Sequence, residues 1–386
     1  MKMSGYEEEI VRYFVEGFSY VEIIELLNRC YNYSISLSTL KRFFKKNHLH
    51  RRPLSNLTCP ADQLKNAVEI QLNSSAAQLG YRRMHKVLLD QGLLCRRTDV
   101  RLLLKELDPD NVKLRRKRRL SCRKYINPGC NHTWHIDGHD KLKPFGFSIH
   151  ACIDGFSRKL IWLEVAPSNK LPEIIAKYYT IAINKFGLPK CLKADDGTEH
   201  AIIEPMHITL RSLDGPDALD SFSIITSPQN QRIEAYWSIL QRDRIGWWRT
   251  FLRELSDLEL FSNDDQVLVD CVRYCFMHLI RQDLNSILRY WNSHIISGSS
   301  RSVGPTGRPD TMFYLPEHFG GRNFSTHLDE EALSEFPDYS SYVIEDYNEE
   351  FETFAQMAIG DHSKPTNTDD AFQMYLKLFE KICENS

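Results

Sequence analysis

The feature that most constrains the fold of this 386-residue sequence is the order of its expected strands and helices between residues 133 and 194. Three short β-prone segments come first, at Thr133–His139, Phe147–Ile153 and Leu160–Val165. A helix over Pro172–Phe186 follows, with proline at its first position, and Lys190–Ala194 is a further short strand. Three antiparallel strands, a crossover helix and another strand predict a mixed α/β sheet.

Three carboxylates lie in or just beyond these elements. Asp137 lies in the first strand, Asp195 directly follows the fourth, and Glu234 lies in a segment with helical character from about Gln229. The first strand and the strand after a crossover helix can be neighbours, so two distant aspartates can meet at one edge, and an adjacent helix can add the glutamate. Such a set would hold two Mg²⁺ or Mn²⁺ ions about 4 Å apart for phosphodiester chemistry. Three acids among 51 prove little alone, because solvated aspartates near strand ends are commoner.

Four motifs in a fixed order surround these acids. They are W-x-x-D at Trp134–Asp137, I-D-G-F-S-R at Ile153–Arg158, L-x-x-D-x-G-T-E at Leu192–Glu199 and S-P-Q-N-Q-x-x-E at Ser227–Glu234. With them, the run from Trp134 to about Asn292 resembles the integrase core of retroviral and retrotransposon integrases and DDE transposases. The resemblance implies an RNase H-like fold with a mixed five-stranded sheet flanked by helices. It also implies a catalytic, metal-binding triad of Asp137, Asp195 and Glu234.

The chain departs from the family pattern in two places. The gap between Asp195 and Glu234 is 38 residues, slightly more than is typical, and a loop insertion around Leu213–Asp220 would accommodate it. The family usually has Asn or Ser after the second aspartate, whereas this chain has Asp196. Asp196 could add charge or compete as the ligand, although position favours Asp195.

The first fifty residues predict three short helices. Ser19 and Glu22 form a capping-box pattern before the second, and the third runs from about Leu37 to Asn47. This arrangement is typical of a helix-turn-helix, whose last helix enters the major groove. The DNA-binding candidates on its exposed face are Lys41, Arg42, Lys45 and Lys46. A basic solvated helix in a small protein-binding bundle is the alternative.

A second helical pair, Tyr81–Gln91 and Thr98–Leu107, precedes a basic block at Lys113–Lys124 in which 8 of 12 residues are Lys or Arg. Such a block suits a polyanion, either a phosphate backbone or a nuclear-import receptor, although a solvated linker without a binding role is the alternative. We expect phosphate contacts from Arg115, Arg116, Lys117, Arg118 and Arg119, and from Arg242 on the helix after Glu234.

The net charge of −2 conceals an uneven distribution of charge along the chain, because residues 327–386 carry 15 acidic residues and 3 Lys/Arg. This tail could shield the basic surface, bind an unknown protein partner, or keep the chain soluble. The composition, 42% hydrophobic and 26% charged, excludes a mostly disordered, collagen-like or coiled-coil chain. No stretch approaches the roughly 20 apolar residues of a membrane helix. The first ten residues lack the apolar core of a signal peptide, so we expect an intracellular protein with reduced cysteine thiols and no membrane association.

These patterns predict six regions. They are a helix-turn-helix-like region (1–52), a second helical region (53–112), a basic linker (113–128), the catalytic core (129–300), a closing motif and linker (301–326) and an acidic helical tail (327–386). We expect a nuclear, homo-oligomeric polynucleotidyl transferase that cleaves and joins DNA with two divalent ions. A domesticated DNA-binding protein without catalysis, and a nuclease that cleaves without joining, remain the alternatives.

Overall fold

The structure is a computed structural model that describes residues 5–50, 59–109, 112, 125–212, 215–226, 229–298, 304–328, 330–360 and 364–385. The chain divides into two compact units. The helical unit consists of Met1–Lys124, Ile239–Trp248 and Ser293–Leu315, and the sheet unit of Tyr125–Ser238, Arg249–Asn292 and Pro316–Ser386.

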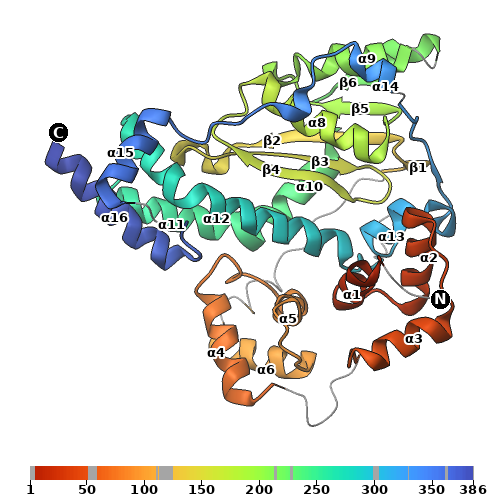
Figure 1. Cartoon of the computed structure of the whole chain (residues 1–386), viewed down its shortest axis with the longest axis horizontal. Coiled ribbons are helices and arrows are strands. Elements are labelled where there is room, and N and C mark those ends of the chain that lie inside the picture. Colours follow the sequence, from red (N-terminus) through yellow and green to blue (C-terminus); the bar gives the residue numbers. More distant parts are fainter. Residues whose placement is uncertain are drawn as a thin grey trace. The chain divides into compact units, whose positions relative to one another are not determined.

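A mixed five-stranded sheet forms the centre of the sheet unit (Figure 1). Its strands are β2 (Thr133–His139), β3 (Ser148–Asp154), β4 (Leu160–Ala166), β5 (Cys191–Ala194) and β6 (Phe222–Ile224). Their order is β4-β3-β2-β5-β6, in which β2, β3 and β4 are antiparallel neighbours while β5 and β6 run parallel to β2. The predicted α/β sheet is therefore confirmed, and β6 is the strand that the residue pattern alone did not identify.

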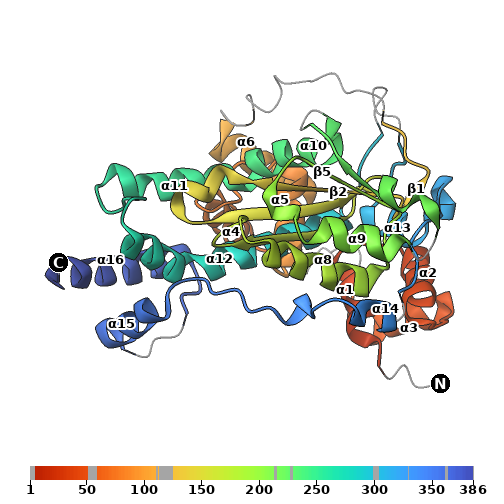
Figure 2. The ribbon, with the colours of Figure 1, turned by 90° about the horizontal axis from the view of Figure 1, so that it is seen from above.

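Helices cover both faces of this sheet. Figures 1 and 2 show α8 (Pro172–Phe186) and α9 (Ile203–Ser212) on one face and α10 (Gln231–Leu240) on the other. Every residue of β3 is consequently buried, although its sequence alternates in polarity. Helix α8 has the predicted bounds and ends at Gly187, whose φ of +82° favours glycine.

The second half of the sheet unit is helical. It contains α11 (Gly246–Asp257, from residue 249 onward), α12 (Gln266–Ser293, to residue 292), α14 (Glu330–Ser334), α15 (Glu349–Ile359) and α16 (Thr368–Asn385). The sequence pattern predicts a helix pair over 265–296, and this prediction is wrong. No Gly or Pro interrupts this stretch, so α12 continues as one helix alongside β4, where Asn292 exchanges two hydrogen bonds with the main chain of Leu160.

In the helical unit, the first helices are α1 (Glu7–Val15), α2 (Tyr20–Tyr31) and α3 (Leu37–Lys46). The predicted capping box is confirmed, because Ser19 accepts from the Glu22 N–H and the Glu22 carboxylate accepts from the Ser19 N–H. Ser36 caps α3, and Leu40 and Phe44 bury its apolar face in a core shared with α1 and α2. Helix α13 (Pro309–Tyr314) packs on α2.

A second core in the same unit joins α4 (Ala61–Leu72), α5 (Tyr81–Asp90) and α6 (Arg97–Leu107). The sequence pattern also predicts that Thr98 caps the last of these helices, and this prediction is wrong, because α6 begins at Arg97 and no side chain caps it. A π-helical segment, η5 (Gln241–Ile245), lies between α10 and α11.

The short elements of the sheet unit are β1 (Gly129–Cys130), β7 (Arg322–Asn323), η1 (Asp140–Phe145), η2 (Thr198–His200), η3 (Pro216–Ser221), η6 (Pro316–Phe319) and η7 (Tyr339–Ser341).

Candidate metal and nucleic-acid sites

The pairing of β2 with β5 brings the two predicted aspartates to one edge of the sheet. Trp134 pairs with Leu192 and His135 with Lys193 in parallel register. Two positions further on, Asp137 lies within β2 and Asp195 directly follows β5. Because parallel strands advance together, the register sets the two aspartates level with each other where β5 ends.

Asp137 lies in the electrostatic field of both other acids. Its side chain is buried, and burial raises its pKa to about 7. The indole N–H of Trp237 opposes this rise by donating to Oδ2 at 2.7 Å, whereas the charges of Asp195 and Glu234 reinforce it. Burial and the charge of Asp195 likewise raise the pKa of Glu234. The charges of the three predicted carboxylates therefore act on one another, although within the described part of the chain the triad does not form a group with all its ligand atoms within 4.8 Å of one another.

A buried hydrogen-bond chain fixes the start of α10 to β2. The Asn230 amide donates to the Ile136 carbonyl at 3.0 Å, and its Oδ1 is 2.7 Å from Nδ1 of His135. The other ring nitrogen of His135 is 2.7 Å from the Tyr125 hydroxyl. Asn230 therefore positions the helix that carries Glu234, and burial lowers the pKa of His135 to about 4, so this histidine stays neutral.

Trp237 connects the same helix to the acid site. Besides its hydrogen bond to Asp137, its ring lies against that of His139, with centroids 4.9 Å apart. In the sequence, Trp237 belongs to an aromatic run with Tyr236, Trp247 and Trp248, a pattern that favours a core role over a base-stacking platform. Burial agrees with that, but the contact with Asp137 is a functional-site feature that the aromatic pattern did not reveal.

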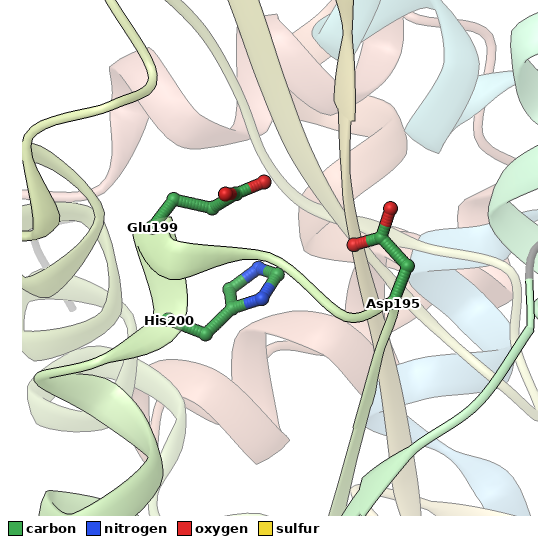
Figure 3. A group of neighbouring side chains, drawn as sticks. All are labelled: Asp195, Glu199 and His200. Carbon is green, nitrogen blue, oxygen red and sulfur yellow. The ribbon is translucent and has the colours of Figure 1, made fainter.

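The turn after β5 adds two further side chains (Figure 3). Among the described residues, Asp195, Glu199 and His200 can each place one ligand atom within 4.8 Å of the others. Asp196 is exposed and lies outside this group, whereas Asp195 acts on both Asp137 and Glu234. Sequence reasoning missed Glu199 and His200, although a D-x-x-x-E-H spacing just after a strand was the available signal.

His200 is a buried imidazole whose pKa is lowered by desolvation, partly offset by the charges of Glu199 and Asp195. Among the described residues neither of its ring nitrogens has a hydrogen-bond partner, and Oδ1 of Asp195 is also buried without one. Unpartnered carboxylate and imidazole atoms of this kind are suitable donors for a divalent cation, and Asp195, which the resemblance assigns to the metal, fits that role.

The motif I-D-G-F-S-R forms the turn between β3 and β4 and takes no part in the carboxylate group. Asp154 is fully buried and accepts hydrogen bonds from the Asn131 N–H at 2.8 Å and from the Ser157 N–H and hydroxyl at 2.8 and 2.7 Å. Any side chain at Gly155 would meet Tyr125, Asn127 and the main chain of Thr133, which explains the glycine.

The predicted DNA-binding residues fall into three groups. Lys41, Arg42, Lys45 and Lys46 are exposed on α3. Arg242 is exposed on the π-helical segment, where its Nε donates to Asp243, which also pairs with Arg83. Arg115, Arg116, Lys117, Arg118 and Arg119 lie outside the described residues.

The strand order, the two parallel strands beside three antiparallel ones and the flanking helices define an RNase H-like integrase-core fold. Residues 124–306 match the family model of the integrase core domain, so the resemblance carried by the motifs is confirmed over this part of the chain. None of the curated proteins compared with the chain matches it. Within the described residues, no helix is both long and apolar enough to span a membrane. An integrase core suggests a polynucleotidyl-transferase-like function and nucleic-acid binding.

Proposed function

We propose that this chain acts on DNA as an integrase- or transposase-like polynucleotidyl transferase. The observation that carries the proposal is that Asp137 and Asp195 lie level on neighbouring strands, with Glu234 of α10 near enough for its charge to raise the pKa of Asp137, inside a region that matches an integrase core. Like charges gathered in a partly buried site are unfavourable unless a cation offsets them, which supports a metal-binding role for the three acids.

The side chains have separate roles in this proposal. Asp137 in β2 and Asp195 directly after β5 would hold the metals, and Glu234 would hold the second ion from α10. Bound divalent ions would activate the attacking water or DNA 3′-hydroxyl and neutralise charge on the phosphodiester and its leaving oxygen. The Trp237 N–H fixes one oxygen of Asp137, so its carboxylate is oriented before any ligand arrives. Asn230 keeps Glu234 in reach by anchoring α10.

Nicking of supercoiled plasmid in the presence of Mn²⁺ tests the proposal, because it requires no knowledge of element ends. We expect the wild-type chain to nick and Asp195→Asn to be inactive, with the exposed neighbour variant Asp196→Asn retaining activity. Equal nicking by wild type and Asp195→Asn would refute the triad assignment. If nicking depends on Asp195, the presence of joined DNA products would distinguish a transferase from a nuclease on the same fold.

The second candidate is a DNA-binding protein that keeps the fold without catalysis. The exposed basic face of α3, on a helix capped and packed as in a helix-turn-helix, favours it. Intact DNA binding without nicking by the wild type would support this candidate instead. The leading proposal includes nuclear location, because the basic block suits a nuclear-import receptor. It also includes assembly into at least a dimer, because chemistry on two DNA ends needs more than one subunit.

A further inference from the structure

The group of Asp195, Glu199 and His200 has features that the carboxylate triad does not account for. Asp195 is common to both sets, whereas Glu199 and His200 lie on η2, one and two residues after Thr198. Figure 3 shows the three side chains converging from the end of β5 and from η2. Glu199 and Asp195 are half-buried, so the open side of the group is the carboxylate side.

His200 is the member that requires explanation. Its side chain is 2% exposed, yet among the described residues neither ring nitrogen has a hydrogen-bond partner. A buried polar group without a partner is unfavourable, and native structures rarely keep one without a role. Oδ1 of Asp195 is in the same condition beside it. An imidazole and a carboxylate that both lack partners at one point indicate a ligand from outside the chain.

The neighbours of the ring identify the type of ligand. Phe222 and His150 border His200, with ring centroids 6.5 and 6.1 Å away. Nδ1 of His150 accepts the Trp162 indole N–H at 3.0 Å, so in the neutral ring the proton is on Nε2 and His150 has no free lone pair to bind a metal. His200 is thus the imidazole available to a cation, and the charges beside it are negative.

We propose that Asp195, Glu199 and His200 form a mixed oxygen–nitrogen metal site that prefers a first-row transition ion such as Mn²⁺ over Mg²⁺. Magnesium favours oxygen ligands and keeps its waters, whereas imidazole nitrogen suits the transition ions. Asp195 has two carboxylate oxygens, so one can face this site and the other the triad. The inference does not require the DNA chemistry proposed above.

Pulsed electron paramagnetic resonance of Mn²⁺ bound to the untagged full chain tests the site, because it detects nitrogen coordinated to the ion. We expect a ¹⁴N coupling in the wild type that changes to the ¹⁵N pattern when histidine is ¹⁵N-labelled. In His200→Phe the coupling disappears, Mn²⁺ affinity falls at least about tenfold, and the preference for Mn²⁺ over Mg²⁺ decreases. Glu199→Gln weakens Mn²⁺ binding, and the exposed neighbour variant Asp196→Asn retains the coupling.

Bound Mn²⁺ without nitrogen coupling in the wild type would overturn the inference while leaving the carboxylate triad intact. The same coupling in wild type and His200→Phe would also overturn it. The isotope-labelled wild type decides the question even if the variant does not fold. A wild-type chain that shows the nitrogen coupling but does not nick DNA would contradict the proposed function and leave the inferred metal site intact.

Discussion

At Asp137, a single buried carboxyl couples the stability of the metal-free protein to pH. Burial, with the charges of Asp195 and Glu234, raises its pKa to about 7. Between its unfolded pKa near 4 and its folded pKa near 7 the folded chain binds the extra proton, so the free energy of unfolding falls as pH rises. One pKa unit corresponds to about 1.4 kcal/mol, and the loss between pH 5 and pH 8 is on the order of 3 kcal/mol.

Asp137→Asn removes this titration while keeping an oxygen that can accept the Trp237 N–H. Urea unfolding in metal-free buffer should therefore show a flatter pH profile for the variant, which becomes the more stable protein at pH 8. Parallel profiles for the two proteins between pH 5 and pH 8 would contradict the raised pKa of the buried Asp137 carboxyl.

At the scale of the element, α10 is placed by Asn230 rather than by its own packing alone. Asn230→Ala leaves the buried His135 ring and the Ile136 carbonyl without this partner, at a cost of about 1–3 kcal/mol for each unsatisfied group. Equilibrium unfolding measures the loss. Ser238→Ala is the matched control, because the Ser238 hydroxyl is exposed on the same helix and donates only to the Glu234 carbonyl. A cost for Asn230→Ala as small as that of the control would refute the anchoring role.

Helix α3 carries the element-scale prediction for DNA. Lys41 and Lys45 are exposed, and Leu40 and Phe44 hold the helix in its core, so Lys41→Ala with Lys45→Ala removes charge without removing packing. DNA affinity should fall, and the slope of log K against log salt should decrease by about 0.9 for each phosphate that the variant no longer neutralises.

The matched double variant is Lys377→Ala with Lys381→Ala, two exposed lysines on α16. Its salt slope should equal that of the wild type. Equal slopes for all three proteins would indicate that α3 is a solvated face of a protein-binding bundle, which was the alternative interpretation of its basic residues.

The elements differed in how far their sequence determined them. Helix α8 was predictable to the residue, because proline at its start and glycine at its end are local signals. Strand β6 is three residues long and forms through its pairing with β5, so no local pattern identifies it. The level placement of Asp137 with Asp195 followed from topology. The Trp237 and His200 contacts depend on how the helices pack and could not be predicted.

At the scale of the sheet unit, the acidic tail is part of the folded structure. Helix α16 buries Ala371, Tyr375 and Leu378, and the Tyr375 hydroxyl donates to the Leu260 carbonyl at 2.7 Å. Before α15, Asp346 forms a bidentate ion pair with Arg281 of α12, at 3.0 and 2.8 Å. A segment that only kept the chain soluble would not need such contacts, so the tail stabilises the helices around α12.

Tyr375 provides the test of this integration. Its ring contacts Phe276 of α12, with centroids 6.1 Å apart, so Tyr375→Ala removes a buried aromatic and should destabilise the sheet unit by about 3–5 kcal/mol. Tyr375→Phe removes only the hydrogen bond to Leu260 and should cost about 1 kcal/mol. Lys377→Ala on the same helix is exposed and should change stability by less than about 0.5 kcal/mol.

Hydrogen exchange of the β2 and β3 amides, measured beside urea unfolding of the same variants, shows whether the acidic tail unfolds together with the sheet or independently of it. If α16 unfolds together with the sheet, Tyr375→Ala lowers the protection of amides in β2 and β3 by the full destabilisation. If the tail is an independent appendage, the variant exposes α16 while the strand amides keep their wild-type protection. The contacts of Tyr375 with both Leu260 and α12 favour the first result, because an element tied at two points of a core opens only when that core does.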